Sequence, residues 1–262
     1  MKKNWIFIIG FVPGIITTIL VLSIIVIIDM EKDYNYYDFE LNTNLNSTQE
    51  KFPSITIHEV GEDSSKIYLF KPINLNMQLR HIRPEFNDEL FLCVPAAYTT
   101  RNNRIDGLFI ENGTQRSNLV TTNRDINGFC IISNNGIEIK RLEDIDDALI
   151  TRIINQKESA FQQTLLIKND TIITVTAWQN RSFKRRAIIQ FEDYFCIGES
   201  QYAVTIRDFQ DALLKAGAKN AIYLDMGTWS EGWYKNELGE KKIIGENMNN
   251  THRQTNWIVY KK

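Results

Sequence analysis

The residues with the clearest capacity for chemistry lie near the C-terminus, in the segment NAIYLDMGTWSEGWYKN (220–236). A short apolar run ends at Asp225, and Gly227 follows at once. A carboxyl group at the end of a buried strand is partly desolvated, which favours a pKa suited to acid–base catalysis. The same side chain could instead bind a cation or sugar hydroxyls, or cap the turn before Gly227 by accepting backbone hydrogen bonds.

Aromatic side chains crowd the same segment and point to a sugar ligand. Trp229, Trp233 and Tyr234 offer flat surfaces on which the C–H faces of a pyranose pack. The alternative is a loop that these side chains pin to the domain. Glu231 is the natural second carboxylate if the chemistry needs two, as most glycoside hydrolysis does, and is otherwise a solvated loop charge.

Short strands must position these residues. Runs rich in Ile, Val, Phe and Tyr, bounded by Asn, Asp or Gly, are typical of strands. Hairpin turns are predicted at Asn169–Asp170 and at Glu192–Asp193. The predicted strands cover residues 66–73, 89–97, 107–112, 128–133, 163–168, 171–178, 186–191, 194–199, 220–225 and 256–261.

Two helices interrupt the strands. The first is predicted from Glu143 to Gln162 by apolar residues at helical spacing. In the second, Thr205 caps the N-terminus, Asp208 takes the capping-box position and Gly217 ends the helix. This helix joins two predicted strands, so Asp225 follows a strand–helix–strand unit. The fold class is α+β, with a mainly antiparallel, twisted mixed sheet and two main helices, preceded by one transmembrane helix.

The N-terminus predicts a membrane anchor. The 24 residues from Trp5 to Ile28 carry no charge, enough to span a hydrocarbon core of about 30 Å. Lys2 and Lys3 precede them, which places the N-terminus in the cytoplasm and the domain outside, in the periplasm or the extracellular space. A cleaved signal peptide is the alternative, but no small-residue cleavage site follows the apolar run. The predicted parts are a cytoplasmic tail (1–4), a transmembrane signal anchor (5–28), a polar tether (29–52) and one domain (53–262).

Composition narrows the possible partners and cofactors. The net charge is −2, which argues against a nucleic-acid partner because such proteins usually carry a basic face. Cys93, Cys130 and Cys196 lie in apolar, strand-like runs and are predicted to be buried thiols. No spacing of Cys and His indicates a zinc site, and the sequence specifies no cofactor.

The order of these pieces resembles the phosphodiester glycosidase domain of the lysosomal uncovering enzyme and its bacterial relatives. An early strand end, a Gly-containing strand, an Arg-containing strand, a helix and an Asp-Gly turn follow one another in that family. The corresponding stretches here are CVPAAYTT (93–100), IDGLFIENG (105–113), KRRAIIQF (184–191) and TIRDFQDALLKAGAKNAIYLDMG (205–227). The resemblance covers most of residues 65–262.

The resemblance assigns roles residue by residue. Arg186 matches the family's Arg, and a guanidinium suits a phosphodiester because it forms paired hydrogen bonds with phosphate oxygens. Its neighbour Arg185 must point to the other face of a strand, so one of the two is predicted to be merely solvated. The family's early Asn is absent from residues 95–97. The predicted catalytic residues are Asp225 and Arg186, and the predicted substrate-binding residues are Tyr98, Thr99, Gly107, Gly227, Trp229, Ser230 and Glu231.

The function implied by the resemblance is a membrane-anchored hydrolase that cleaves a sugar joined to phosphate through its anomeric oxygen. Its partners would be a sugar-phosphate or glycan ligand and the membrane. The missing Asn favours an alternative, a non-catalytic envelope module that binds a glycan or a protein partner. A third hypothesis is a structural membrane protein whose aromatic loop only packs.

Overall fold

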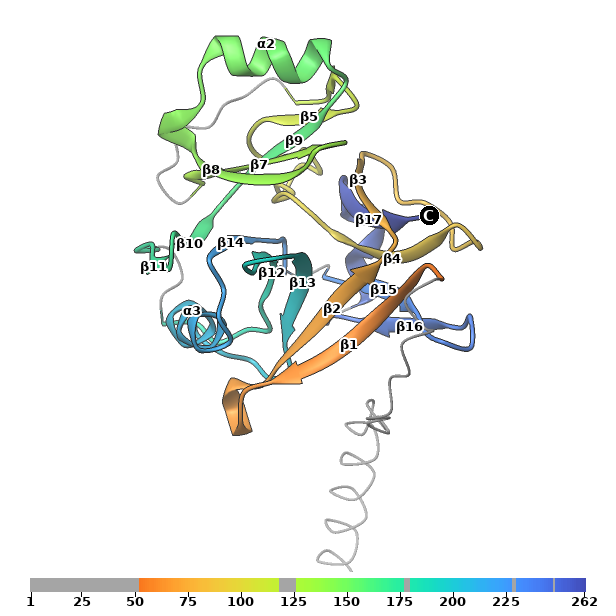
Figure 1. Cartoon of the computed structure of the whole chain (residues 1–262), viewed down its shortest axis with the longest axis vertical. Coiled ribbons are helices and arrows are strands. Elements are labelled where there is room, and N and C mark those ends of the chain that lie inside the picture. The colour runs from red at the N-terminus through yellow and green to blue at the C-terminus, as the bar shows by residue number, and fades with distance from the viewer. Residues whose placement is uncertain (1–51, 118–125, 177–179, 228–229, 247) are drawn as a thin grey trace, which may run out of the picture. The chain divides into compact units, whose positions relative to one another are not determined.

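The computed structural model describes residues 52–117, 126–176, 180–227, 230–246 and 248–262, all within the compact unit Thr48–Lys262. These residues form an α+β fold, in which three antiparallel sheets are accompanied by two α-helices (Figure 1). The α+β class and the mainly antiparallel pairing are confirmed, but the strands form three sheets where the sequence predicted one.

The predicted transmembrane segment and tether lie outside the described residues. Within the described part of the chain, no helix is both long and apolar enough to cross a membrane. The anchor at residues 5–28 therefore stays a prediction.

Sheet A carries the Arg-containing strand and the strand that leads to Asp225. Its seven strands lie in the order β1-β2-β13-β12-β14-β10-β11, and every pair is antiparallel. Because β12 pairs with both β13 and β14, it lies between the two strands that the second helix connects. The strands are β1 (Ser54–Val60), β2 (Ile67–Ile73), β10 (Leu165–Lys168), β11 (Thr171–Ile172), β12 (Arg186–Gln190), β13 (Phe195–Ser200) and β14 (Asn220–Tyr223).

Sheet B contains part of the segment that the sequence analysis read as a loop. Its order is β16-β15-β4-β17-β3. Trp233 and Tyr234 lie in β15, where Trp233 is only 1% exposed and packs in a buried cluster with Trp257. Both aromatic residues are therefore core residues. The strands are β3 (Asn76–Arg80), β4 (Leu90–Pro95), β15 (Gly232–Lys235), β16 (Lys241–Ile244) and β17 (Trp257–Lys261).

Sheet C lies beneath helix α2 and has the order β6-β5-β9-β7-β8 (Figure 1). Its central strand β9 continues through Thr164 into β10, so one stretch of chain serves two sheets. The strands are β5 (Phe109–Glu111), β6 (Thr114–Gln115), β7 (Gly128–Ser133), β8 (Gly136–Arg141) and β9 (Ser159–Gln163).

The first predicted helix is much shorter than expected. A 3-10 turn, η3 (Leu142–Asp144), precedes α2 (Asp147–Asn155), and the predicted C-terminal part of the helix is strand β9. Lys157 adopts a left-handed backbone with φ 54°, which ends the helix without a glycine. All five residues of β9 are buried, so pairing within sheet C overrode the helical pattern.

The second helix, α3 (Ile206–Lys215), forms as predicted. The Thr205 hydroxyl accepts from the N–H of Asp208 at 3.1 Å, and Gly217 follows the helix with φ 94°. Its apolar side packs on sheet A, where Phe209 and Leu213 join the core.

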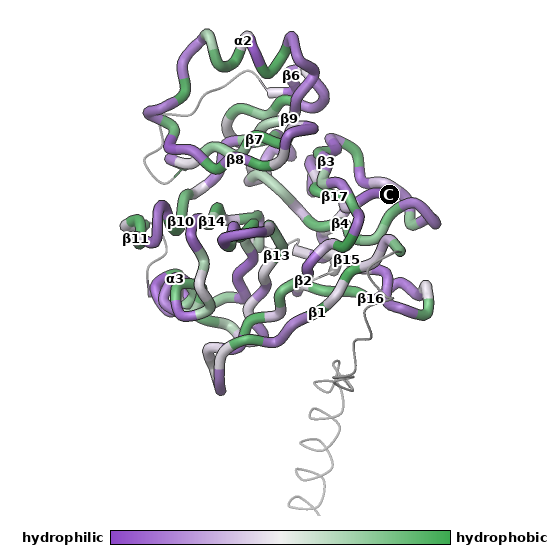
Figure 2. Tube along the Cα trace, viewed as in Figure 1, coloured by the Kyte–Doolittle hydropathy of each residue, from purple (hydrophilic) through white to green (hydrophobic). Residues whose placement is uncertain are grey.

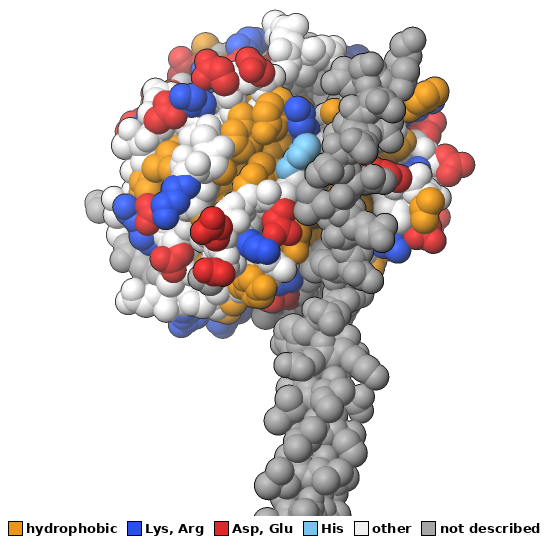
Figure 3. Space-filling view, turned by 60° about the horizontal axis from the view of Figure 1, so that its bottom comes forward, with side chains coloured by type: hydrophobic (Ala, Val, Ile, Leu, Met, Phe, Trp, Pro, Cys, Tyr) orange, Lys and Arg blue, Asp and Glu red, His pale blue; other side chains and the backbone are white. Residues whose placement is uncertain are grey.

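Figure 2 shows hydrophobic residues following the strands, and Figure 3 shows acidic and basic side chains mixed over one face. Two further 3-10 turns are η2 (Asp63–Ser65) and η4 (Met248–Arg253).

The three cysteines are buried free thiols, as predicted. Burial raises the pKa of Cys93 and of Cys196 to about 12 and raises the pKa of Cys130 further. None of the three is therefore set up as a nucleophile at neutral pH.

We expect the folded protein to lose stability above about pH 9, where unfolded thiols ionise but buried ones do not. The unfolded state then binds fewer protons, so the free energy of unfolding falls by up to about 1.4 kcal/mol per pH unit for each thiol. Urea unfolding across the alkaline range measures this slope, and Cys196→Ala should reduce it. Rapid reaction of the native thiols with a thiol reagent at neutral pH would contradict the burial argument.

Candidate functional site

Asp225 lies where the three sheets meet. Its backbone N–H donates to the carbonyl of Ala96, just beyond β4 of sheet B, at 2.9 Å. Two residues earlier, the N–H of Tyr223 donates at 2.8 Å to the carbonyl of Thr164, which joins sheet C to sheet A. Main-chain hydrogen bonds thus fix the loop after β14 from two sides.

Backbone donors also hold the carboxylate of Asp225. Its Oδ2 accepts from the N–H of Thr99 at 3.0 Å, and its Oδ1 accepts from the N–H of Gly227 at 3.2 Å. Asp225 is only 5% exposed. This is the turn-capping geometry given above as the alternative to a chemical role. Capping and chemistry are compatible, because each carboxylate oxygen can accept more than one hydrogen bond.

Polar side chains border the carboxylate and keep part of their surface in solvent. The Thr99 hydroxyl donates to Gln254 Oε1 at 3.0 Å and lies 3.2 Å from the hydroxyl oxygen of Thr255. Thr99 and Thr255 are half-buried. The amide of Asn256 is fully buried and bonds both the N–H and the carbonyl of Ala97, at 2.6 and 3.0 Å.

The sequence analysis missed the polar residues 254–256. One signal could have identified them as site residues: they stand directly before the apolar run WIVYK, at the start of a predicted strand. Gly227, whose N–H donates to the carboxylate, is itself exposed. Trp229, predicted to stack on the sugar, lies outside the described residues.

Two tyrosines flank the Asp225 loop near Arg185: Tyr223 is buried and Tyr98 is half-buried. The rings of Tyr98 and Tyr223 have centroids 6.0 Å apart, and Arg185 Nη1 donates to the Tyr223 hydroxyl at 3.2 Å. Burial raises the pKa of both tyrosines, so their hydroxyls stay protonated at neutral pH. Arg185 is 2% exposed and Arg186 is fully buried. The prediction that one of them is merely solvated was wrong, because sheet A is covered on both faces.

Arg186 is engaged in a buried ion pair with Glu199. Its Nε donates to Glu199 Oε2 at 2.8 Å, its Nη2 donates to the same oxygen at 2.5 Å, and its Nη1 donates to the Ser230 carbonyl at 3.1 Å. Glu199 Oε1 accepts from the N–H of Gly245 at 3.1 Å. The guanidinium thus connects sheet A to the far end of the Asp225 loop. Neither the sequence patterns nor the resemblance had singled out Glu199.

Ser230 and Glu231 anchor that end of the loop. The Ser230 hydroxyl donates to the Glu246 carbonyl at 2.7 Å and accepts from the N–H of Glu246 at 2.8 Å. Glu231 forms an ion pair with Arg83 and accepts from the Thr251 hydroxyl at 3.2 Å. Glu231 is therefore a paired carboxylate, where the sequence analysis offered a second catalytic acid or a solvated charge.

Gly107 lies on the loop that returns from the end of β4. The loop is closed by a hydrogen bond of 2.8 Å from the N–H of Asp106 to the Tyr98 carbonyl. Gly107 has φ 84°, and a Cβ there would lie 3.0 Å from Oε1 of the buried Gln162. Glycine is thus needed for packing, and contact with substrate stays a prediction. Among the described residues, no group of three or more His, Cys, Asp or Glu is placed to hold a metal ion.

The sequence and the fold were compared with those of known proteins. Residues 94–259 match the phosphodiester glycosidase (NAGPA) family. This chain belongs to the phosphodiester glycosidase family. No curated protein sequence matches it.

Two solved structures are similar to this phosphodiester glycosidase domain. The catalytic domain of zebrafish N-acetylglucosamine-1-phosphodiester alpha-N-acetylglucosaminidase, auto-inhibited by its pro-peptide, gives a TM-score of 0.51 at 12% identity, covering 80% of this chain and 82% of that one. A hypothetical protein from Synechocystis gives 0.48 at 12% identity, covering 79% and 62%. At such identities, the likeness to the zebrafish domain shows the fold alone.

The phosphodiester glycosidase match includes every predicted site residue. The matched residues also include the backbone donors to Asp225 and the Arg186–Glu199 pair. Strand β3 and Tyr260 lie outside the match. The structure thus brings Thr99, Asp225 and Gly227 into direct contact. Arg186 joins this group through Ser230 at the other end of the loop.

Proposed function

We propose that this chain hydrolyses a sugar 1-phosphodiester and that the reaction takes place at Asp225. Water adds to the anomeric carbon, the anomeric C–O bond breaks, and free sugar and a phosphomonoester leave. The observation that carries the proposal is the position of Asp225. Within a phosphodiester glycosidase domain, this buried carboxylate is held by backbone donors beside the half-buried residues Thr99 and Thr255.

The predicted site residues have proposed tasks. Asp225 takes a proton from water or orients the sugar, while Thr99 and Thr255 contact sugar hydroxyls. Arg186 acts through the loop, because its guanidinium hydrogen bonds already go to Glu199 and Ser230. It is therefore proposed as a positioning residue rather than as the phosphate contact. Trp229 stacks on the sugar.

Residues 5–28 anchor the domain outside the cytoplasm. Alkaline carbonate extraction of membranes would test whether this segment is embedded in the bilayer.

Asp225→Asn tests the proposed reaction. The full-length chain is incubated with sugar 1-phosphodiesters, such as the methyl phosphodiesters of glucose 1-phosphate and of N-acetylglucosamine 1-phosphate, and free sugar is measured. We expect Asp225→Asn to lower the rate by at least about 100-fold, because a positioned acid or base contributes roughly 10²- to 10⁴-fold. Asp211→Asn, on the exposed side of α3, is the matched control and should leave the rate unchanged.

An isotope experiment identifies the bond that breaks. In ¹⁸O-water, cleavage of the anomeric C–O bond places the label in the sugar, whereas cleavage at phosphorus places it in the phosphate. Label in the phosphate, or no turnover of any substrate in the panel, would count against the proposal.

A non-catalytic binding module is the second candidate. Two observations favour it: both oxygens of Asp225 accept backbone hydrogen bonds, and Glu231 is paired with Arg83. In that case the same phosphodiesters would bind without turnover, and Asp225→Asn would change affinity but release no sugar.

A further inference from the structure

The phosphate of the proposed substrate needs a cation, and both arginines at the start of the Arg-containing strand are already engaged. Arg186 is fully buried, and its guanidinium donates to Glu199 and to the Ser230 carbonyl. Arg185 is 2% exposed, and its three guanidinium nitrogens all donate to groups of the protein. The phosphate contact therefore has to come from another part of the Asp225 site.

Arg253 lies beside the residues that border Asp225. It is half-buried and precedes Gln254, which accepts the hydrogen bond from the Thr99 hydroxyl. Its guanidinium lies against the loop that follows Thr99. Its Nε donates to Asn103 Oδ1 at 3.0 Å, and its Nη2 donates to the Arg101 carbonyl at 2.7 Å. These contacts join the two segments that border the carboxylate.

That loop adds two more arginines at the same edge. Two hydrogen bonds close it, from the N–H of Thr100 to the Arg104 carbonyl at 2.7 Å and from the N–H of Asn103 to the Thr100 carbonyl at 3.0 Å. The side chains of Arg101 and Arg104 are exposed. The acidic residue within residues 100–106 is Asp106. The edge beside Thr99 is therefore positively charged.

The position of Arg253 relative to Asp225 suits a leaving group. Thr99 donates to the Asp225 carboxylate, and Arg101 comes two residues later, about 7 Å along an extended chain. In inverting glycoside hydrolysis, the base and the group that faces the leaving oxygen are about 6.5–9.5 Å apart. A phosphomonoester is an anion at neutral pH, so it can leave without an acid, and a guanidinium can stand in the acid's place.

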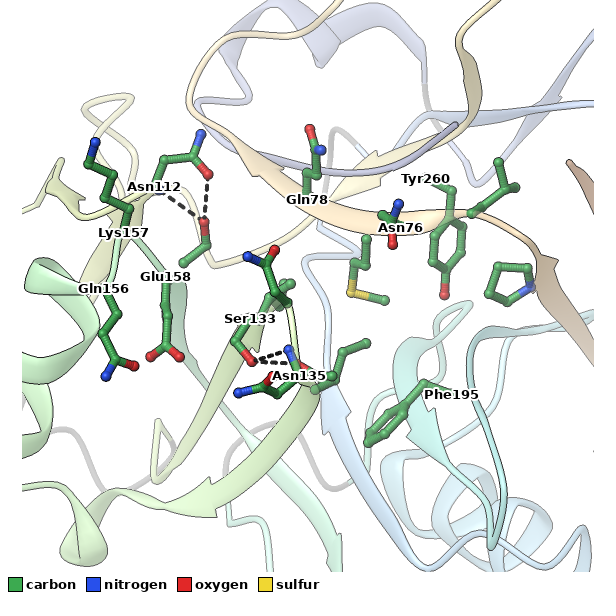
Figure 4. Close-up of a pocket in the computed structure, with 18 of the residues that line it drawn as sticks. Asn76, Gln78, Asn112, Ser133, Asn135, Gln156, Lys157, Glu158, Phe195 and Tyr260 are labelled. Carbon is green, nitrogen blue, oxygen red and sulfur yellow. Dashed lines mark hydrogen bonds between the residues drawn. The ribbon is translucent and has the colours of Figure 1, made fainter.

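The cavity of about 650 Å³ in Figure 4 offers no comparable cluster of cations. Its charged side chains are Lys157 and Glu158, and Glu158 is paired with Arg152 at 3.3 Å. Neither Asp225 nor any residue that donates to its carboxylate lines this cavity.

We propose that Arg253 holds the phosphate of the sugar 1-phosphodiester, and that Arg101 and Arg104 attract it through their charge. This inference rests on the proposed hydrolysis at Asp225 and assigns its phosphate contact. Arg253 then determines specificity, because it favours a phosphate over a neutral leaving group.

The first experiment compares two substrates of the full-length chain that share one sugar. One is the methyl phosphodiester of glucose 1-phosphate, and the other is 2,4-dinitrophenyl glucoside, whose leaving group carries no phosphate. For the phosphodiester, Arg253→Gln should lower kcat/KM by about 10- to 100-fold, the effect of losing a hydrogen bond between charged groups. For the glucoside, kcat/KM should stay unchanged. Arg253→Lys should recover part of the loss, because it keeps the charge without the paired donors.

The second experiment measures binding without turnover. Calorimetry follows the methyl phosphodiester binding to Asp225→Asn, alone and combined with Arg253→Gln, which should weaken binding by about tenfold. Two cations away from the site serve as controls: Lys157→Gln, at the cavity of Figure 4, and Arg207→Gln, on the exposed side of α3. Both should leave binding and kcat/KM unchanged.

Three results would overturn the phosphate contact. Arg253→Gln could leave the phosphodiester unaffected, or it could lower kcat/KM equally for both substrates, which would mean that it only disturbs the loop. Lys157→Gln could instead weaken phosphodiester binding. If the wild type hydrolyses neither substrate, the proposed hydrolysis fails, and calorimetry still decides whether Arg253 holds the phosphate. Absence of phosphodiester binding there would also count against it.

Discussion

Replacing Glu199 by Ala should lower the free energy of unfolding by about 3–5 kcal/mol, the usual cost of leaving a buried charge without its partner. Glu199 is 2% exposed and Arg186 is fully buried. Without the carboxylate, the guanidinium would keep only the Ser230 carbonyl, among the contacts described above, in surroundings without water. Urea unfolding of the variant and of the wild type measures the difference.

Two comparisons isolate the ion pair as the cause. Asp211→Ala removes the partner of Arg207 in an exposed pair on α3 and should cost less than about 1 kcal/mol. The double change Arg186→Met with Glu199→Leu should cost less than the sum of its single changes, because it leaves no unpaired charge. If Glu199→Ala cost no more than Asp211→Ala, the pair would not stabilise the fold as argued.

The same pair gives Arg186 a way to influence the proposed hydrolysis without contacting the substrate. Arg186 holds the carbonyl of Ser230, and Glu199 holds the N–H of Gly245. The loop that starts at Asp225 thus ends on a charged anchor. Partial activity in a folded Arg186→Met variant would fit a positioning role.

Much of this anchor could have been predicted from sequence. A hairpin that turns at Glu192–Asp193 sets a register in which Arg186 lies opposite Glu199, and the structure has this pairing. Side chains directly opposite in an antiparallel pair share a face. The capped helix α3 was predictable for a similar reason, because its signals lie within one turn of chain.

The remaining features depend on contacts between distant segments. Helix α2 ends earlier than predicted because the residues after it form β9, which pairs within sheet C. No local sequence signal identifies Lys157 as the residue where the helix ends. Trp233 enters the core only because β15 pairs with β4, far earlier in the chain. The contact of Thr99 with Gln254 likewise joins segments far apart in sequence. Short-range patterns carry no information on such pairings.

Gly245→Ala should be among the most damaging small substitutions in this domain. Gly245 has φ 88°, and a Cβ there would lie 2.2 Å from the Ser230 carbonyl oxygen and 2.9 Å from Arg186 Nη2. The methyl group would therefore push apart the backbone of the Asp225 loop and the guanidinium that holds it. We expect a loss of more than about 3 kcal/mol in unfolding free energy, because strain and a broken buried network combine.

Gly239→Ala separates backbone strain from this clash. Gly239 has a similar φ of 79°, but nothing lies within 4 Å of its ideal Cβ position. It should therefore cost only about 1–2 kcal/mol, the price of a left-handed backbone for a residue with a Cβ. The difference between the two variants measures how tightly the loop end is packed on the ion pair. Equal losses would mean that the loop moves aside easily, and Arg186 could then not hold the Asp225 loop in place.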